Sequence, residues 1–152
     1  LAGFGMSSDA KDITTPDAGG MARAMKGALR DASLNTTDIH YINAHGTGTR
    51  SNDTTETKAI KLAFEGSTIP PLSSSKSMFG HALGAAGALE MVATVLAVKN
   101  QIAPATLNFV EKDPECDLDI IPNTARAMPI NAAISNSFAF GGLNAVLAVK
   151  KI

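Results

Sequence analysis

The chain is organised around the stretch Tyr41-Ile42-Asn43-Ala44-His45-Gly46-Thr47-Gly48-Thr49. An apolar run ends there in a polar loop that presents His45, and the glycines allow the backbone to bend sharply around it. A second loop, residues 73–81, also follows a short apolar run and ends in His81. A third glycine-rich loop lies at residues 138–142. The pattern predicts a scaffold that carries these three loops towards one point.

Length and composition fit one α/β domain. A chain of 152 residues with 45% hydrophobic residues is long enough to bury a sizeable core. Its net charge of −1 gives no electrostatic footprint for nucleic acid or an anionic membrane surface, so neither partner is expected. No transmembrane span is expected either, because the sequence shows no uninterrupted run of about 18 apolar residues. The first residues read as a buried strand entered partway, so we expect a piece of a longer protein.

Hydrophobic periodicity predicts the element order β-α-β-α-β-α-β-β, which is typical of a mixed sheet with helices packed against it. The expected strands are residues 3–6, 39–43, 69–72, 130–138 and 143–149, and the expected helices are residues 20–32, 52–64 and 84–98. Asp17 is expected to cap the first helix, and Gly66 to end the second. The third helix is rich in glycine and alanine and apolar nearly all round, so we expect it to be central and buried.

The two loop histidines are the leading candidates for chemistry. The chain has only three histidines, and two of them stand in matching glycine-rich contexts, which favours function over a structural role for His45 and His81. Zinc is the specific alternative, but Thr/Gly/Ser loops supply poor zinc ligands and no HxxxH or CxxC spacing supports it, so no metal is expected. Lys76 could hold a negative charge near His81. Glu90 is the only ionisable residue of residues 84–98, and we expect it to order a polar network behind the histidines.

Other polar groups accompany the three loops. Thr47 and Thr49 could offer hydroxyls to a polar ligand. The turn at residues 138–142 supplies backbone N–H groups of the kind that hold an oxyanion. Cys116, the only cysteine, lies among carboxylates that should raise its pKa, and we interpret it as a loop cysteine without chemistry.

Five motifs, in order along the chain, resemble the C-terminal half of β-ketoacyl-acyl-carrier-protein synthases, the condensing enzymes of fatty acid synthesis. They are Gly3-Phe-Gly-Met-Ser-Ser-Asp-Ala10, Asn43-Ala-His-Gly-Thr-Gly-Thr49, Lys76-Ser-Met-Phe-Gly-His81, Leu83-Gly-Ala-Ala-Gly-Ala88 and Asn136-Ser-Phe-Ala-Phe-Gly-Gly142. The chain is most similar to the type II elongating enzymes and their nodulation-type relatives. The resemblance implies an α/β, thiolase-like fold in which residues 1–152 form the C-terminal synthase domain, with a mixed β-sheet packed between α-helices around a buried Gly/Ala-rich helix.

The resemblance also implies a Cys-His-His site. A cysteine from the N-terminal half, absent here, would take the acyl chain, while His45 and His81 would serve the decarboxylation of malonyl-carrier protein. Lys76 would order the site near His81, and Glu90 would belong to its polar network.

Substrate contacts are implied in the same way. Thr47 and Thr49 would hold the pantetheine arm. The backbone N–H of Phe140 would form half of an oxyanion hole, and its ring would gate the acyl pocket, with Phe138 and Gly141 of the same turn lining the substrate path. No cofactor is expected to be bound by the protein itself, since the 4′-phosphopantetheine arm enters as part of the substrate.

The implied partners are acyl carrier protein and the chain's own N-terminal half, in a cytoplasmic enzyme that is a homodimer when full length. Without the nucleophilic cysteine, this chain alone should not condense. The alternative is a non-catalytic, chain-length-determining partner subunit, against which the retention of both histidines and Lys76 argues. A thiolase would need a cysteine in the final loop, where Ala139 and its neighbours provide none. Ala139 and Leu143 replace the family's usual glycine and threonine and could alter the gate.

Overall fold

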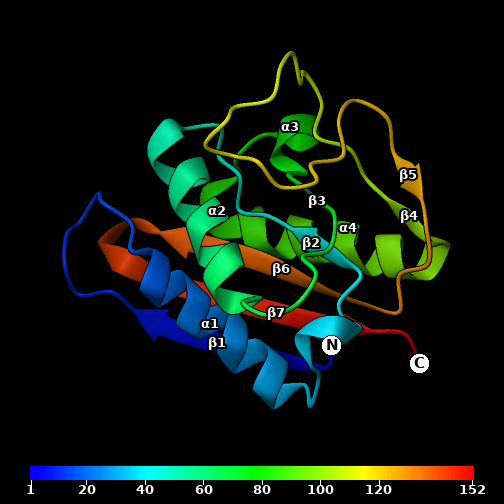
Figure 1. Ribbon diagram of the computed structural model, residues 1–152, viewed down its shortest axis with the longest axis horizontal. Helices are drawn as coiled ribbons and strands as arrows, with labels where there is room; N and C mark the ends of the chain where they lie inside the picture. The colour runs from blue at the N-terminus through cyan, green and yellow to red at the C-terminus, as the bar shows by residue number, and fades with distance from the viewer.

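The computed structural model describes residues 1–152 and contains a mixed sheet of five strands in the order β1-β7-β6-β2-β3 (Figure 1). The strands are β1 (Gly3–Ser8), β7 (Leu143–Lys150), β6 (Ala132–Ala139), β2 (Tyr41–Asn43) and β3 (Leu72–Ser73). Neighbours in the β1-β7-β6 part are antiparallel, whereas β6, β2 and β3 run parallel to one another. The predicted mixed sheet, including the antiparallel pairing of the last two strands, is therefore confirmed.

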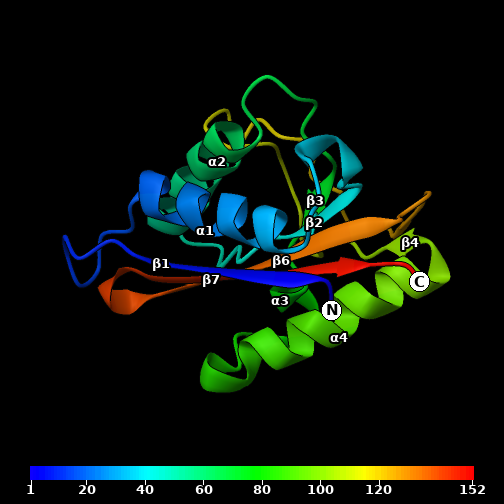
Figure 2. The same cartoon turned by 90° about the horizontal axis from the view of Figure 1, so that it is seen from below.

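Helices cover both faces of this sheet. Helices α1 (Ala18–Asp31) and α2 (Arg50–Ala63) lie on one face, and α4 (Ala86–Asn100) lies on the other (Figure 2). The shorter elements are η1 (Thr36–Asp38), α3 (Lys76–Phe79), η2 (Leu83–Ala85), β4 (Ile102–Ala103), β5 (Arg126–Ala127) and η3 (Phe140–Gly142). Successive residues of the strands point to opposite faces of the sheet and pack into two separate hydrophobic cores. Ile42 and Ile134 pack in the core with α1 and α2, while Tyr41 and Ala133 pack in the core with α4.

The start of α1 follows the sequence prediction. Asp17 is extended, and its carboxylate accepts a hydrogen bond of 2.9 Å from the backbone N–H of Gly20. Helix α2 instead begins at Arg50, before the predicted residue 52, because Thr49 is already extended and acts as the N-cap residue. The second strand begins at Tyr41, two residues later than predicted, and a 3₁₀ turn over Thr36–Asp38 precedes it. Boundaries of this kind depend on local caps more than on the apolar pattern.

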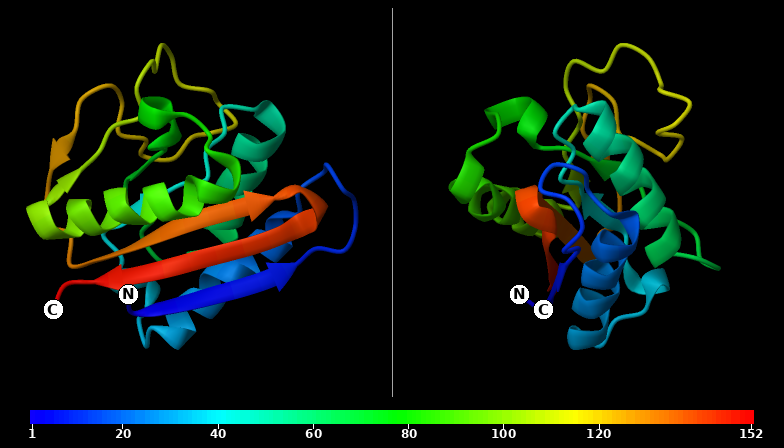
Figure 3. Two further views of the ribbon diagram at one scale, coloured as in Figure 1. Left: turned by 180° about the vertical axis from the view of Figure 1, so that it is seen from behind. Right: turned by 90° about the vertical axis from the view of Figure 1, so that its left-hand side faces the viewer.

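Helix α4, which the sequence predicts to be central and buried, is buried on one side only in this chain. The side of α4 that packs on the sheet buries Glu90, Thr94 and Ala97. Its other side is open to solvent, where the exposed residues are Leu89, Val92, Val95 and Leu96 (Figure 3). The reason is that this chain supplies only one layer to cover a helix that is apolar on two sides.

One stretch meets the length and composition of a membrane span. Residues Leu83–Asn100 form 18 helical residues with a mean hydropathy of 1.2, long and apolar enough to cross a membrane by length and composition alone. A single helix of this kind is weak evidence, because core helices of water-soluble proteins pass the same test. Here α4 packs along β6 and β7 and buries Glu90 against them.

Candidate active site

Parallel strands bring the two histidine loops together. Because Ile42 pairs with Leu72 and Asn43 with Ser73, β2 and β3 end at the same edge of the sheet. The loop after β2 carries His45, and the loop after β3 continues through α3 to His81. The two imidazole rings lie edge to face, with centroids 5.5 Å apart and planes at 87°. The ring of Phe138, at the end of β6, contacts His45 at a centroid distance of 5.8 Å.

His45 is held as a neutral imidazole. Its ring is buried, and Nδ1 lies 3.2 Å from Nζ of Lys76, which also donates to the His45 carbonyl oxygen at 2.6 Å. An ammonium group has donors only, so Nδ1 is the acceptor and the ring proton resides on Nε2. Burial and then the charge of Lys76 lower the pKa of His45 to about 3. At neutral pH the ring therefore offers a single N–H donor at Nε2.

His81 reaches the same tautomer by a different route. The backbone N–H of Leu83 points to its Nδ1 at 3.3 Å, so Nδ1 again accepts and Nε2 is the ring donor. Unlike His45, His81 is exposed.

Lys76 lies on His45, whereas the sequence placed it near His81. Its Nζ forms hydrogen bonds with His45 and an ion pair with Glu90, and none reaches His81. The Lys76 side chain turns towards His45 because its amine pairs with the buried carboxylate of Glu90, which projects from α4 beneath the loop. Burial raises the pKa of Glu90, and the Lys76 charge opposes that rise. The second carboxylate oxygen of Glu90, Oε2, has no hydrogen-bond partner. The expected contact between Glu90 and the polar groups behind the histidines is present.

Glu56 is buried in α2, and the sequence pattern did not single it out as a site residue. One of its carboxylate oxygens accepts the backbone N–H of His45 at 2.9 Å, and the other accepts that of Gly46 at 2.8 Å. Burial raises the pKa of Glu56, and the donated hydrogen bonds oppose the rise. The sequence does contain a signal that could have identified Glu56. Its carboxylate lies on the inward face of a helix, at helical spacing from the apolar residues Ile60 and Ala63.

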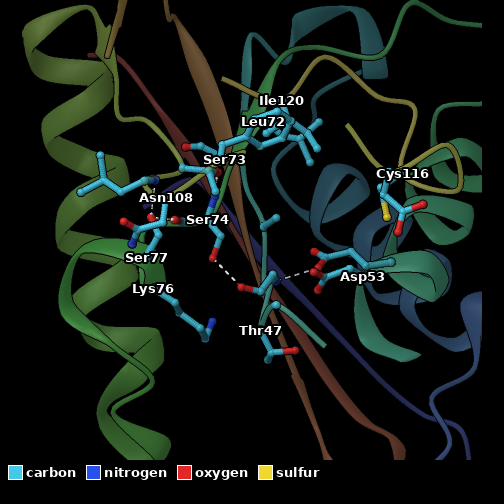
Figure 4. Close-up of a pocket in the computed structure, with 18 of the residues that line it drawn as sticks. Thr47, Asp53, Leu72, Ser73, Ser74, Lys76, Ser77, Asn108, Cys116 and Ile120 are labelled. Carbon is cyan, nitrogen blue, oxygen red and sulfur yellow. Dashed lines mark hydrogen bonds between the residues drawn. The ribbon is translucent and has the colours of Figure 1, made fainter. Parts of the chain in front are cut away.

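Thr47 and Thr49 stand at the entrance to this region. Their hydroxyl oxygens are 2.8 Å apart, so one donates to the other. Thr47, Lys76 and His81 line a cavity of about 850 Å³ that extends between α2 and the segment from Thr106 to Cys116. Figure 4 shows Lys76 and Thr47 at one side of this cavity and Cys116 at the other.

Cys116 lies far along this cavity, in a position without partners for catalysis. The pKa of its thiol is raised, as the sequence predicted, but burial contributes more than the neighbouring Asp113, Asp53 and Glu115. No group of three or more His, Cys, Asp or Glu side chains is placed to hold a metal ion.

The turn after β6 is supported from behind by the loop that follows β1. Gly141 and Gly142 have φ values of 78° and 72°, which favour glycine. The Gly141 N–H donates to the Ile13 carbonyl at 2.8 Å, and the Asp9 N–H donates to the Gly142 carbonyl at 2.9 Å. The buried Asp9 carboxylate in turn accepts from Nδ2 of Asn144 at 2.7 Å. Sequence reasoning missed this support, which joins residues about 130 positions apart.

The two aromatic rings of the turn have different surroundings. Phe138 is buried against His45, whereas the Phe140 ring is 80% exposed. The gate and oxyanion-hole roles of Phe140 therefore stay predictions.

The sheet therefore brings the imidazole rings of His45 and His81 together at one edge, with their centroids 5.5 Å apart. Comparison with known proteins gives the family. The description "Beta-ketoacyl synthase, C-terminal domain" matches residues 1–110, and the chain belongs to this family.

Relatives and solved structures of this family match the whole length of the chain. It is 50% identical to nodulation protein E of Rhizobium sp. (strain N33) and 48% identical to 3-oxoacyl-[acyl-carrier-protein] synthase 2 of Vibrio harveyi, covering 100% of this chain and 38% of each relative. The structure of the ishigamide ketosynthase/chain length factor superposes with a TM-score of 0.97 at 42% identity, again over 100% of this chain and 38% of the other. The predicted fold, the C-terminal half of a thiolase-like ketosynthase, is confirmed. The chain spans well under half the length of these relatives.

Proposed function

We propose that this chain is the C-terminal half of a 3-oxoacyl-acyl-carrier-protein synthase, which joins an acyl thioester to malonyl-carrier protein with loss of CO₂. One observation carries the proposal. His45 and His81 lie in edge-to-face contact, and each has its Nδ1 occupied as an acceptor, so each ring presents Nε2–H.

The geometry suits one step in particular. Loss of CO₂ from a malonyl thioester breaks a C–C bond and leaves its electron pair on the α-carbon, delocalised onto the thioester oxygen. Two N–H donors on that oxygen stabilise the enolate as its charge develops. Because the pKa of His45 is low, its ring is a neutral hydrogen-bond donor in this step and not an imidazolium that would transfer a proton to the enolate. The carbanion then attacks the acyl thioester on the cysteine, and the thiolate leaves.

The remaining parts of the reaction lie outside this chain. The chain covers 38% of the Vibrio harveyi relative, which is therefore about 2.6 times as long. In the proposal the N-terminal half supplies the nucleophilic cysteine. The chain's single cysteine, Cys116, is remote from the histidines, so the chain alone would not condense. The exposed apolar side of α4 supports contact with that half.

The carrier protein and its pantetheine arm are the proposed substrate partner. The name of the Vibrio harveyi relative includes this partner, and Thr47 opens onto the cavity beside His81. In this proposal the arm passes the two threonine hydroxyls and no cofactor remains on the protein. By analogy with the type II elongating condensing enzymes, the full-length protein is proposed to be a homodimer in the cytoplasm.

A non-catalytic chain-length-determining subunit is the alternative. The detailed setting of the histidines weighs against it, because a subunit without chemistry has no need of a buried Lys76–Glu90 pair aimed at His45.

The test uses the full-length protein and two separate assays. One measures CO₂ release from malonyl-carrier protein, and the other measures acylation of the N-terminal cysteine. His45→Ala and His81→Ala should each abolish CO₂ release while acylation survives at least in part. Wild-type rates of CO₂ release in both variants would refute the roles of the two rings.

A further inference from the structure

The backbone pairing that joins the two histidine loops is short. β2 and β3 pair at only two positions, the second of which joins Asn43 to Ser73. One more hydrogen bond follows, from the N–H of Ala44 to the Ser73 carbonyl at 2.9 Å. Beyond these residues, no hydrogen bond between backbone groups connects the loop of His45 with the loop that carries Lys76. Side chains therefore set how close the two loops lie.

Two serine side chains make this connection, which we call the serine clasp. Ser74 Oγ donates to the carbonyl of Gly46 at 2.7 Å. Ser75 Oγ donates to Oδ1 of Asn43 at 2.9 Å, and Nδ2 of Asn43 donates in turn to Ser135 Oγ in β6 at 3.2 Å. Asn43 and Ser75 are buried, so bulk water does not compete for these hydrogen bonds.

The serine clasp lies directly before Lys76. Ser75 precedes α3, and Lys76 is the first residue of that helix. The amine of Lys76 lies 3.2 Å from Nδ1 of His45 and donates to the His45 carbonyl at 2.6 Å. The ion pair with Glu90 fixes only the far end of the Lys76 side chain. The clasp fixes the other end, because it holds the two residues that come immediately before Lys76 in the chain.

We propose that Ser74 and Ser75 are positioning residues. Their hydroxyl groups hold the backbone of Lys76 at the distance from which its amine keeps Nδ1 of His45 as an acceptor, and so they direct Nε2–H of His45 to the substrate. The catalytic consequence rests on the proposed condensing function. The contact between Lys76 and His45 depends on the clasp whatever reaction the site performs.

A second side-chain bridge between the same two segments offers a matched control. The hydroxyl groups of Tyr41 and Ser73 are both buried and lie 2.7 Å apart, so one donates to the other. Tyr41 lies four residues before His45 and packs in the core with α4. Loss of its hydroxyl group removes one buried hydrogen bond between the segments without touching either loop. A general loss of stability can therefore be told apart from a displacement of Lys76.

The test is Ser75→Ala in the full-length protein, with Tyr41→Phe as the control. Alanine leaves Oδ1 of Asn43 as a buried acceptor without a donor, so the two loops shift relative to each other. We expect Ser75→Ala to lower kcat for CO₂ release about 10-fold, because small displacements of a positioned group have effects of this size. Acylation of the cysteine should stay within about threefold of wild type. Tyr41→Phe should lower the Tm and leave CO₂ release within about twofold of wild type.

Wild-type CO₂ release in Ser75→Ala, or equal losses of CO₂ release in Ser75→Ala and Tyr41→Phe, would overturn the proposal. If Ser75→Ala does not fold, Ser74→Ala serves in its place, since it removes the other hydrogen bond of the clasp and should reduce the same step selectively.

A measurement independent of activity reports on the Lys76 contact directly. The ¹⁵N signal of His45 Nδ1 depends on the hydrogen bond from Lys76, so it should move in Ser75→Ala and stay in place in Tyr41→Phe. An unmoved signal in Ser75→Ala would refute the positioning role even in an active enzyme. Absence of CO₂ release in the wild-type protein would refute the proposed function and leave this test of the serine clasp intact.

Discussion

The neutral state of His45 can be tested by lowering the pH. Burial and the nearby Lys76 lower the pKa of the ring to about 3, against an ordinary value of about 6.5. At pH 5 about 1% of His45 should then be protonated, whereas an unperturbed histidine would be about 97% protonated. The shift is large because a second positive charge beside Lys76 would have to be accommodated in a buried site.

The same shift makes a prediction about stability. Below pH 6.5 the unfolded chain binds a proton at His45 and the folded chain does not, so the folded state loses stability as the pH falls. The free energy of unfolding should decrease by about 1.4 kcal/mol per pH unit between about pH 6 and pH 4 from this residue alone. Carboxylates titrate in part of this range, so the comparison must isolate the histidine.

Two assays on the full-length protein separate these effects. ¹³C-labelled histidine reports the ring of His45 by NMR between pH 7.5 and 4.5, and the spectrum of His45→Asn identifies its signal. Asparagine can still accept a hydrogen bond from Lys76 but cannot titrate. Denaturant unfolding of both proteins then gives a stability difference that should narrow by about 3 kcal/mol between pH 6.5 and 4. A His45 ring that titrates near pH 6.5, or a stability difference that does not change with pH, would refute the reasoning.

Two further predictions concern the backbone and the open face of α4. Gly46→Ala should destabilise the protein by about 1–3 kcal/mol in denaturant unfolding and suppress CO₂ release. The reason is that φ of Gly46 is 41° and an added Cβ would lie 2.5 Å from Cβ of Ser74. An unchanged Tm would contradict this prediction. Val92→Asp should lower the Tm and soluble yield of the full-length protein, because Val92, which is 58% exposed in this chain, lies on the side of α4 that the N-terminal half is proposed to cover. The same change at the loop residue Val110, which is 93% exposed, should be tolerated, and equal tolerance at both positions would mean that the side of α4 stays in water.

Much of the site was predictable because its residues stand at the ends of apolar runs. A strand followed by Gly-rich sequence places His45 at a sheet edge whatever the rest of the chain does. The second histidine loop repeats that pattern, and parallel neighbouring strands bring both loops to the same edge. The sequence therefore predicted that the two rings come together.

The exact partners of the charged groups could not be read from the sequence. Lys76 is five residues from His81 along the chain, yet its amine bonds to His45, which is 31 residues away. Spacing along the chain places residues on an element but does not say which neighbouring element a long, flexible side chain will reach. The buried carboxylate of Glu90, on a helix from the other face of the sheet, decides that direction.

The sequence by itself determined the order of the strands and helices, the Asp17 cap and the loops that hold the two histidines, because these depend on local periodicity and on residues a few positions apart. Only the tertiary structure decided that Glu56 holds the His45 turn, that Asp9 supports the Gly142 turn and that Lys76 bonds to His45 and Glu90. Those features depend on contacts between distant segments, where burial removes water and each polar group must find its partner within the protein.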